Sequence, residues 1–534
     1  MGTSNFNRFG VMLDNSRNAV MNVISVKKYI DLLSDLGCDF LMLYTEDTYE
    51  VNGRPYFGHH RGKYSKEELK ELDAYAKSKG VELCPCIQTL AHLNAIMRWP
   101  EFGALADWGD ILCAGDENVY KLIEDIFSTL DECFTSRTVN IGMDEAESIG
   151  LGRYLREHGL ENRMDILVRH LKRVAEIAAK YGFKLLMWGD MFYKLTGGPE
   201  DKAAFDKTLS ESIPENVNLI YWDYYSTEKE HYDSRILNYR KLRENVWFAG
   251  GLWTWSGFTP HLSYALRATE AALRSCIEHK VRNVFMTVWG DNGGETSRFS
   301  IIPALFAACE FSKGNFDMID IKSAFEKKFG IGFDDFMLLE LPDTPNTDNG
   351  SINNPEKYML YSDPFMGNLD SLVKGDEGER YLKCAEKLEK LSHGNDYAHI
   401  FDVVYKLAKV IAIKYDLGVR TRELYLKKDV KGLTDIISVY DELLVKIDDF
   451  YNALEKWWMI ENKPHGFDVQ DIRIGGLIKR IKHCRNRLLL YVEGRIDRIE
   501  ELEDTVLHPF CGDVNDKGAV CYNSWGYSCT CNVL

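Results

Sequence analysis

The sequence lacks any long apolar run. No stretch approaches about eighteen consecutive apolar residues, and the first residues, MGTSNFNRFGVMLD, contain neither an apolar segment nor a signal cleavage site. We therefore expect no secretion and no membrane partner. Basic residues are also in deficit, with 65 Lys plus Arg against 82 Asp plus Glu and a formal charge of -17. Because a negative field repels phosphate backbones, we expect no nucleic-acid partner.

Internal repeats and low-complexity tracts are absent as well, and 45% hydrophobic with 28% charged residues is an ordinary globular composition. Seven of the thirteen cysteines lie in apolar runs, where they resemble small core residues kept reduced in a cytosol: Cys38, Cys84, Cys86, Cys113, Cys133, Cys276 and Cys309. This pattern favours a cytoplasmic protein. Four further cysteines near the end of the chain fit no standard zinc spacing, so we expect no metal: Cys511, Cys521, Cys529 and Cys531.

Short apolar runs alternate with amphipathic helical stretches from residue 7 to about residue 313, which predicts parallel strands joined by helices. The expected strands cover residues 9–13, 39–44, 81–87, 138–143, 184–188, 218–222, 246–251 and 283–289. Ser65 and Glu68 have the spacing of a capping box, and Gly37, Gly80 and Gly182 stand where helices should stop. Eight buried strands with helices between them predict a closed (β/α)8 TIM barrel of the α/β class.

The pattern changes past residue 314. A segment rich in Asp, Asn, Pro and Gly at 342–357 leads into expected helices at 377–393, 398–427, 430–457 and 470–500. We therefore expect three parts: a disordered or tag-like segment at 1–6, the catalytic barrel at 7–318 and a mainly α-helical C-terminal domain at 319–534. The helical domain could cover the barrel, wall one side of the pocket or form a homodimer face.

A barrel of this kind carries its working residues at the carboxyl ends of its strands. Acidic and aromatic side chains follow nearly every expected strand in order: Asp14 and Arg17; Tyr44, Glu46 and Asp47; Gln88 and His92; Asp144 and Glu145; Trp188 and Asp190; Trp222, Asp223, Tyr224 and Tyr225; Trp253 and Trp255; Trp289, Asp291 and Asn292. One such residue is as often a salt bridge or a packed ring as a ligand. Together they favour a pocket that stacks a sugar ring on indoles and binds its hydroxyls with acids.

The most specific motif is VNIGMDEAE, in which Asp144 and Glu145 are adjacent at the end of the fourth expected strand. Glycoside cleavage needs an acid to protonate the leaving oxygen and a second group at the anomeric carbon. Neighbouring residues of a regular strand point to opposite faces, so both can reach one substrate only where the strand breaks into its loop. Two adjacent carboxyl groups also raise one pKa, which suits a general acid at neutral pH.

Four motifs follow the expected strands in order: an acidic pair after strand two, a histidine after strand three, G-x-D-E after strand four and W-G-D after strand eight. This series resembles glycoside hydrolase family 20, the β-N-acetylhexosaminidases. The resemblance covers about residues 7 to 313. It implies that Glu145 is the general acid/base and that Asp144 orients and polarises the 2-acetamido group of the substrate. The oxygen of that group is the nucleophile and gives an oxazoline intermediate. The resemblance implies no metal or organic cofactor.

Other roles come from the same resemblance. Glu46 and His92 match the acid and the histidine that tune the proton of the acid/base, and Asp291 matches an acid on the outer hydroxyls. Trp188, Trp222, Trp253 and Trp289 resemble the indoles of the sugar pocket, and Tyr224 is the candidate donor to the acetamido oxygen. Phe9 replaces the usual arginine of strand one, so the guanidinium that binds sugar hydroxyls beside Asp14 is expected to come from Arg8, from Arg17 or from neither. The family's tyrosine after strand seven is replaced by Leu252-Trp253-Thr254-Trp255.

The sequence thus predicts a retaining, exo-acting β-N-acetylhexosaminidase that releases terminal GlcNAc, and GalNAc, from glycans or glycoconjugates. Three alternatives stay open. A two-carboxylate glycosidase would use Glu145 as acid and Asp190, Asp223 or Asp291 as nucleophile. An enzyme that trims O-linked GlcNAc from proteins would carry an Asp-Asp pair, which this chain lacks at position 145. A sugar-binding protein without catalysis would lack the acid or the polarising group.

Overall fold

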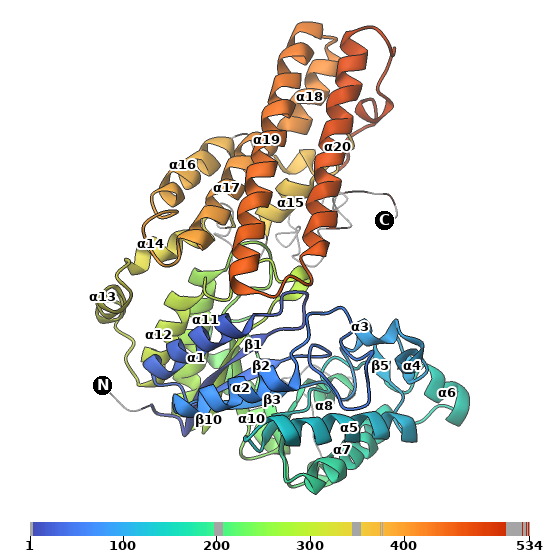
Figure 1. The fold of residues 1–534 in the computed structure, drawn as a ribbon, viewed down its shortest axis with the longest axis vertical. Coiled ribbons are helices and arrows are strands. Elements are labelled where there is room, and N and C mark those ends of the chain that lie inside the picture. The colour runs from blue at the N-terminus through green and yellow to red at the C-terminus, as the bar shows by residue number, and fades with distance from the viewer. Residues whose placement is uncertain are drawn as a thin grey trace. The chain divides into compact units, whose positions relative to one another are not determined.

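The computed structural model describes residues 4–196, 207–343, 354–373, 375, 377–508, 526, 530 and 532 (Figure 1). The described residues fall into two compact units. The first comprises Met1–Leu252, Tyr264–Gly290 and Ala304–Ile321, and the second comprises Trp253–Ser263, Asp291–Pro303 and Lys322–Leu534. The predicted domain limits at 7–318 and 319–534 stay a prediction. The division itself assigns two loops that follow barrel strands, 253–263 and 291–303, to the helical unit.

The first unit is built on a closed barrel of eight parallel strands in the order β1-β10-β9-β8-β7-β6-β3-β2. The strands are β1 (Arg8–Asp14), β2 (Phe40–Tyr44), β3 (Glu82–Cys86), β6 (Thr138–Asn140), β7 (Lys184–Trp188), β8 (Val217–Trp222), β9 (Trp247–Gly251) and β10 (Asn283–Val288). Nearly every strand residue is buried, as expected for strands covered on both faces. The predicted TIM barrel is confirmed, and all eight expected strands are present.

The register of the barrel fixes which residues share an end. Along β1, Arg8 pairs with Asn283 of β10, and Asp14 pairs with Tyr44 of β2. Arg8 therefore lies at the amino end of the barrel and Asp14 at the carboxyl end. A short antiparallel hairpin, β4 (Ala106–Trp108) and β5 (Ile111–Leu112), lies in the loop between β3 and α5 and was not predicted.

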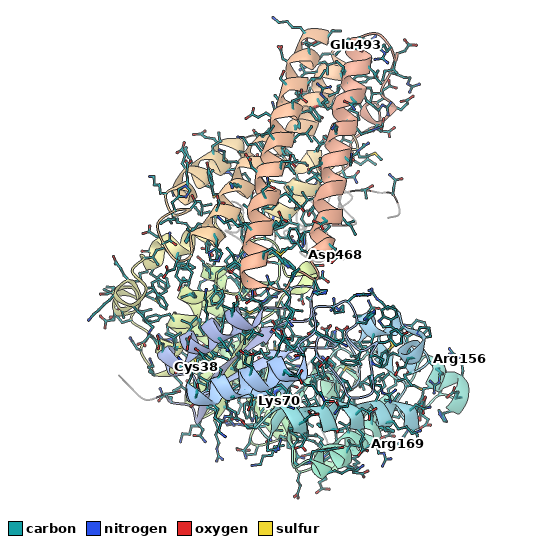
Figure 2. All side chains as sticks on the ribbon, in the orientation of Figure 1. Cys38, Lys70, Arg156, Arg169, Asp468 and Glu493 are labelled. Atoms are coloured by element: carbon teal, nitrogen blue, oxygen red, sulfur yellow. The ribbon has the colours of Figure 1, made fainter. Side chains whose placement is uncertain are left out.

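Helices connect the strands and form the outer ring, in which α1 contacts α2, α2 contacts α5 and α5 contacts α7 (Figure 1). Their bounds are α1 (Val23–Leu36), α2 (Lys66–Ser78), α3 (Asn94–Met97), α4 (Pro100–Gly103), α5 (Glu117–Cys133), α6 (Arg153–His158), α7 (Arg163–Lys180), α8 (Asp190–Lys194), α9 (Lys207–Ser212), α10 (Lys229–Leu242), α11 (Leu262–Glu278) and α12 (Ile302–Ser312). The Ser65–Glu68 capping box begins α2, and Gly37 ends α1 in the left-handed conformation just before Cys38, which Figure 2 labels.

The second unit is mainly helical, as predicted. Its helices are α13 (Met318–Phe329), which spans the division between the units, α14 (Phe333–Met337), α15 (Pro355–Tyr361), α16 (Glu377–Glu389), α17 (Ala398–Lys414), α18 (Leu417–Leu426), α19 (Val430–Glu461) and α20 (Asp468–Val492). Asp468 and Glu493, labelled in Figure 2, mark the two ends of α20. Over the described part of the chain, no helix combines the length and the hydropathy needed to span a membrane.

The start of the chain differs in part from the expected disordered segment. The Asn5 backbone N–H donates to the Ser312 carbonyl at 2.8 Å, and the Phe6 ring is buried and stacks on Phe9 at 6.1 Å. Residues 4–6 are therefore held against the first unit. Residues 1–3 lie outside the described residues.

Candidate active site

The chain becomes irregular where β6 ends, and this irregularity sets the direction of the acidic pair. Gly142, Met143 and Glu145 all have positive φ, at 74°, 70° and 52°. Only glycine adopts this region without cost, and a Cβ on Gly142 would lie 2.0 Å from the Gln88 Oε1 atom. Because the segment is no longer extended, the alternation of a strand does not separate Asp144 from Glu145.

Asp144 is buried within a set of polar partners. Its Oδ1 atom accepts a hydrogen bond from Gln88 Nε2 at 2.9 Å, and its Oδ2 atom lies 3.2 Å from His92 Nε2. Burial opposes ionisation, yet the His92 charge and the Gln88 hydrogen bond hold the pKa of Asp144 below its ordinary value. Asp144 is therefore a carboxylate that can accept a hydrogen bond from a ligand.

Gln88 joins this carboxylate to the backbone that carries it. Its amide nitrogen also donates to the Tyr44 hydroxyl at 3.0 Å, and its Oε1 atom accepts from the Met143 backbone N–H at 3.2 Å. Gln88 was noted at the rim of the barrel from the sequence, but no role was predicted for it. A buried amide with donors and acceptors on both sides is a positioning group, which sequence spacing alone does not reveal.

His92 lies between the two acidic residues. Its Nε2 atom is 3.2 Å from Asp144 Oδ2 and 3.7 Å from Glu145 Oε2. Burial would lower the pKa of His92, but the negative charge of Asp144 outweighs it and raises that pKa to about 9. His92 is therefore a cation at neutral pH, and it faces both acidic residues of the motif.

Glu46 belongs to the same charge network. Its Oε1 atom accepts from the Tyr44 hydroxyl at 2.9 Å and pairs with Arg17 Nε at 3.2 Å. Burial raises the pKa of Glu46 to about 7, against the lowering effects of Arg17 and His92. Glu46 can therefore gain or lose a proton near neutral pH.

Arg17 and Asp14 lie at the same end of the barrel. The Arg17 Nη1 atom donates to Asp14 Oδ2 at 2.9 Å, and its guanidinium lies 5.1 Å from the ring centres of both Tyr44 and Trp289. Asp14 is fully buried and also accepts from the Gly290 backbone N–H at 2.9 Å. The structure thus brings Arg17 and Asp14 together with Glu46.

Aromatic side chains from three strand ends form a connected group. The Trp188 ring lies 6.0 Å from the Trp289 ring, whose indole N–H donates to the Tyr224 hydroxyl at 3.0 Å. Tyr224 stacks on Trp222 at 5.4 Å. These contacts bring the Tyr224 hydroxyl together with three of the predicted indoles, and the role of Tyr224 toward the acetamido group stays a prediction.

Glu145 is the most exposed acid of the group, with half of its side chain accessible. Its backbone N–H donates to Asp190 Oδ2 at 3.0 Å, and its Oε1 atom lies 3.8 Å from Lys194 Nζ. Asp190 was considered from the sequence only as a rival nucleophile, and Lys194 was missed. The i, i+4 spacing of Asp190 and Lys194 was the available signal.

One residue predicted to bind the sugar lies at the opposite end of the barrel from Asp14 and Arg17. Arg8 begins β1 at the amino end of the barrel, where it pairs with Glu82 and lies 4.6 Å from the Phe40 ring centre. Functional groups of this fold gather at the carboxyl end, so Arg8 is not placed to bind sugar hydroxyls. Arg8 was proposed because it is adjacent in sequence to Phe9, which replaces the family's arginine. The length of β1 separates Arg8 from the carboxyl end of the barrel.

Two other predicted residues belong to the second unit. Trp253 stacks on Trp255 with ring centres 4.2 Å apart, and its carbonyl accepts from the His261 backbone N–H at 3.0 Å. Asp291 opens a short 3-10 helix, Asp291–Gly293, and the carbonyl of the next residue, Asn292, accepts from Arg473 Nη1 at 2.6 Å. Their predicted roles toward the sugar stay predictions.

One further observation bears on the alternatives. Asp223, a rival nucleophile, is already bound by the Tyr221 hydroxyl at 2.8 Å and by His231 Nε2 at 2.6 Å.

Within the described ranges, no group of three or more His, Cys, Asp or Glu side chains is arranged to hold a metal ion. The cysteines at 511, 521, 529 and 531 lie outside the described residues.

Replacing Arg8 with Met tests its reassignment. We expect KM to stay unchanged, because the residue lies at the far end of the barrel from Asp14 and Arg17. The thermal midpoint should fall slightly, since a partly exposed ion pair contributes about 0–1 kcal/mol. Steady-state kinetics and thermal unfolding check this. A severalfold rise in KM would restore Arg8 as a sugar ligand.

The His92–Asp144 pair predicts a pH-dependent stability. Because the pKa of His92 is raised to about 9 in the folded state, its contribution is fully present below its unfolded pKa of about 6.5 and disappears as pH rises through about 9. The midpoint temperature of thermal unfolding should therefore decrease as pH is raised from about 6.5 to about 9. His92→Gln should flatten this part of the curve, and equal slopes for both proteins would contradict the pairing.

Two models of known protein families match parts of this chain. The model described as "Glycosyl hydrolase family 20, catalytic domain" matches residues 6–234, and "Glycoside Hydrolase 20C C-terminal domain" matches residues 334–520. The first match includes the acidic pair, Glu46, His92, Trp188 and Tyr224. The second falls within the helical unit.

Named relatives have low sequence identity. Human Hexosaminidase D is 23% identical over 396 residues, covering 68% of this chain and 77% of the relative. A Beta-hexosaminidase of Akkermansia muciniphila is 26% identical over 215 residues, covering 34% of this chain and 43% of the relative. Among solved structures, beta-N-acetylhexosaminidase from Bacteroides fragilis NCTC 9343 is 21% identical with a TM-score of 0.48, covering 61% of this chain and 70% of that one.

Proposed function

Since the chain belongs to glycoside hydrolase family 20, we propose that it is an exo-acting, retaining β-N-acetylhexosaminidase that uses the acetamido group of its substrate as nucleophile. The observation that carries this proposal is the arrangement around His92. One imidazolium lies 3.2 Å from Asp144 and 3.7 Å from Glu145, which brings a carboxylate and a more exposed acid to the same end of the barrel.

In the first step, the acetamido carbonyl oxygen attacks C1 of the terminal sugar, and the bond from C1 to the leaving oxygen breaks. Glu145 gives its proton to that oxygen. Asp144 accepts the acetamido N–H and stabilises the positive charge that develops on the oxazoline ring. The lowered pKa of Asp144 keeps it negative for this task.

In the second step, water attacks C1 while the Glu145 carboxylate takes one of its protons. The bond between C1 and the oxazoline oxygen breaks and restores the acetamide. Two displacements at C1 give net retention of configuration. Tyr224 donates to the acetamido oxygen, the tryptophans Trp188, Trp222 and Trp289 enclose the ring, and Arg17 with Asp14 binds its hydroxyls.

The natural substrate class is a glycan or glycoconjugate that ends in β-linked GlcNAc, with GalNAc also accepted. We further propose a cytoplasmic location, since the nine described cysteines are free and buried, and the thiols of Cys38 and Cys309 share a hydrogen bond at 3.6 Å and form no disulfide. The homodimer stays a prediction.

The test compares the 4-nitrophenyl β-glycosides of GlcNAc and of glucose, with the first-formed sugar anomer followed by proton NMR. We expect nitrophenol release from the GlcNAc glycoside alone, with β-GlcNAc formed first. Equal cleavage of the glucoside would favour the two-carboxylate alternative. Release from neither substrate would favour a sugar-binding protein.

A further inference from the structure

We propose that Asp190 is a positioning residue for the general acid, which fixes the backbone of Glu145 and balances the positive charge beside its side chain. This inference rests on the proposed function. It assigns a specific role to a carboxylate that the sequence offered only as a rival nucleophile.

The first argument is the backbone contact. Asp190 begins α8 and is separated from the end of β7 by Gly189 alone, and its side chain is only 2% exposed. Its Oδ2 atom accepts the Glu145 backbone N–H at 3.0 Å. Glu145 has φ of 52°, a region that non-glycine residues adopt only when their surroundings hold them there. The Asp190 carboxylate is such a constraint, because it binds the amide of the strained residue itself.

The second argument is the arrangement of charge around the Glu145 side chain. Lys194 lies 3.8 Å from Glu145 Oε1, and His92 lies 3.7 Å from Glu145 Oε2. Two cations therefore flank the group that is proposed to donate the proton. Asp190 lies 3.3 Å from Lys194 Nζ, and Glu147 lies 2.5 Å from the same atom. These two carboxylates therefore offset the Lys194 charge.

The environment of Asp190 also couples it to Asp144. Burial, with the negative charge of Asp144 added to it, raises the pKa of Asp190 to about 7, although Lys194 and the Glu145 amide act in the opposite direction. Its second oxygen, Oδ1, is buried without a hydrogen-bond partner among the described residues. Asp190 is therefore a carboxyl group whose charge changes near pH 7, beside both Asp144 and Glu145.

Three variants separate the two roles. Asp190→Asn keeps the shape and an oxygen that can accept the Glu145 amide, but removes the charge. Lys194→Met removes the opposite charge from the same cluster. Asp190→Ala removes the acceptor altogether. Asp165→Asn, an exposed acid in the first turn of α7, is the matched control. Each full-length protein is assayed on N,N′-diacetylchitobiose, which has a poor leaving group, and on 4-nitrophenyl β-GlcNAc, which has a good one.

We expect opposite shifts in the pH profiles of kcat/KM for the disaccharide. The basic limb should move to lower pH in Asp190→Asn and to higher pH in Lys194→Met, each by about half a pH unit or more. Asp190→Ala should lower kcat on the disaccharide about 30-fold with KM nearly unchanged, and on the nitrophenyl glycoside only about threefold. The control should match the wild type in every respect.

The proposal would be overturned if Asp190→Ala lost the same factor in kcat on both substrates. It would also be overturned if the basic limbs of Asp190→Asn and Lys194→Met shifted in the same direction or did not shift. A merely structural role predicts no dependence on the leaving group or on the sign of the charge. If Asp190→Ala does not fold, the pH profiles of Asp190→Asn and Lys194→Met test the proposal on their own. A wild-type protein that cleaves neither substrate would refute the proposed function instead, so the two failures are distinguishable.

Discussion

Replacing Glu145 with Gln should lower kcat/KM on N,N′-diacetylchitobiose by about a thousandfold, the usual scale for loss of a general acid. The sugar leaving group departs as an alkoxide unless it is protonated, and glutamine has no proton to give. On 4-nitrophenyl β-GlcNAc, kcat/KM reports formation of the oxazoline with a leaving group that needs little help, so the loss there should be about tenfold or less.

The substitution should leave the fold unchanged, because the Glu145 side chain is half exposed and glutamine has the same shape. Glu157→Gln, an exposed acid on α6, is a suitable control. The measurement is kcat/KM on both substrates, with thermal unfolding as a check on folding. A loss of the same size on both substrates would show that Glu145 is not the proton donor.

Asp144→Asn should have the second large effect, a loss of about 100- to 1000-fold in kcat on 4-nitrophenyl β-GlcNAc, comparable with removal of one stabilising group at a developing charge. Asparagine can still accept the acetamido N–H, but it carries no negative charge to stabilise the oxazoline as it forms. Because the leaving group hardly matters to this role, the disaccharide should lose rate by a similar factor.

Two readouts accompany this variant. The affinity for a stable oxazoline mimic should fall with kcat, since both depend on the same charge. The raised pKa of His92 should also move back toward its ordinary value, because Asp144 raises it more than Glu46 does. NMR titration of the His92 ring follows this directly. Activity near that of the wild type would exclude assistance by Asp144.

The fold was largely predictable because the barrel strands are almost continuously apolar and are separated by clear helix stops such as Gly37 and Gly182. The hairpin of β4 and β5 was not, since strands of three and two residues carry no periodicity. The single helix expected at 398–427 is interrupted between Lys414 and Leu417, where the local sequence holds no proline.

The candidate site was predictable to the extent that it follows strand ends. Asp144, Glu145, Glu46 and His92 come together because parallel strands bring their carboxyl ends to one edge. Arg8 lies at the amino end of β1, one strand length away from that edge. The contacts of Gln88 and Asp190 depend on the positive φ values at Gly142, Met143 and Glu145, and no sequence pattern specifies how a loop turns there.

The central claim, that the acetamido oxygen of the substrate is the nucleophile, is tested most directly by a series of 4-nitrophenyl β-glycosides of glucosamine. The N-acetyl group carries zero, one, two or three fluorines, which weaken the carbonyl oxygen without changing the leaving group. The account predicts that kcat falls steeply with each added fluorine. A kcat that stays constant across the series would show that a group of the protein attacks the sugar.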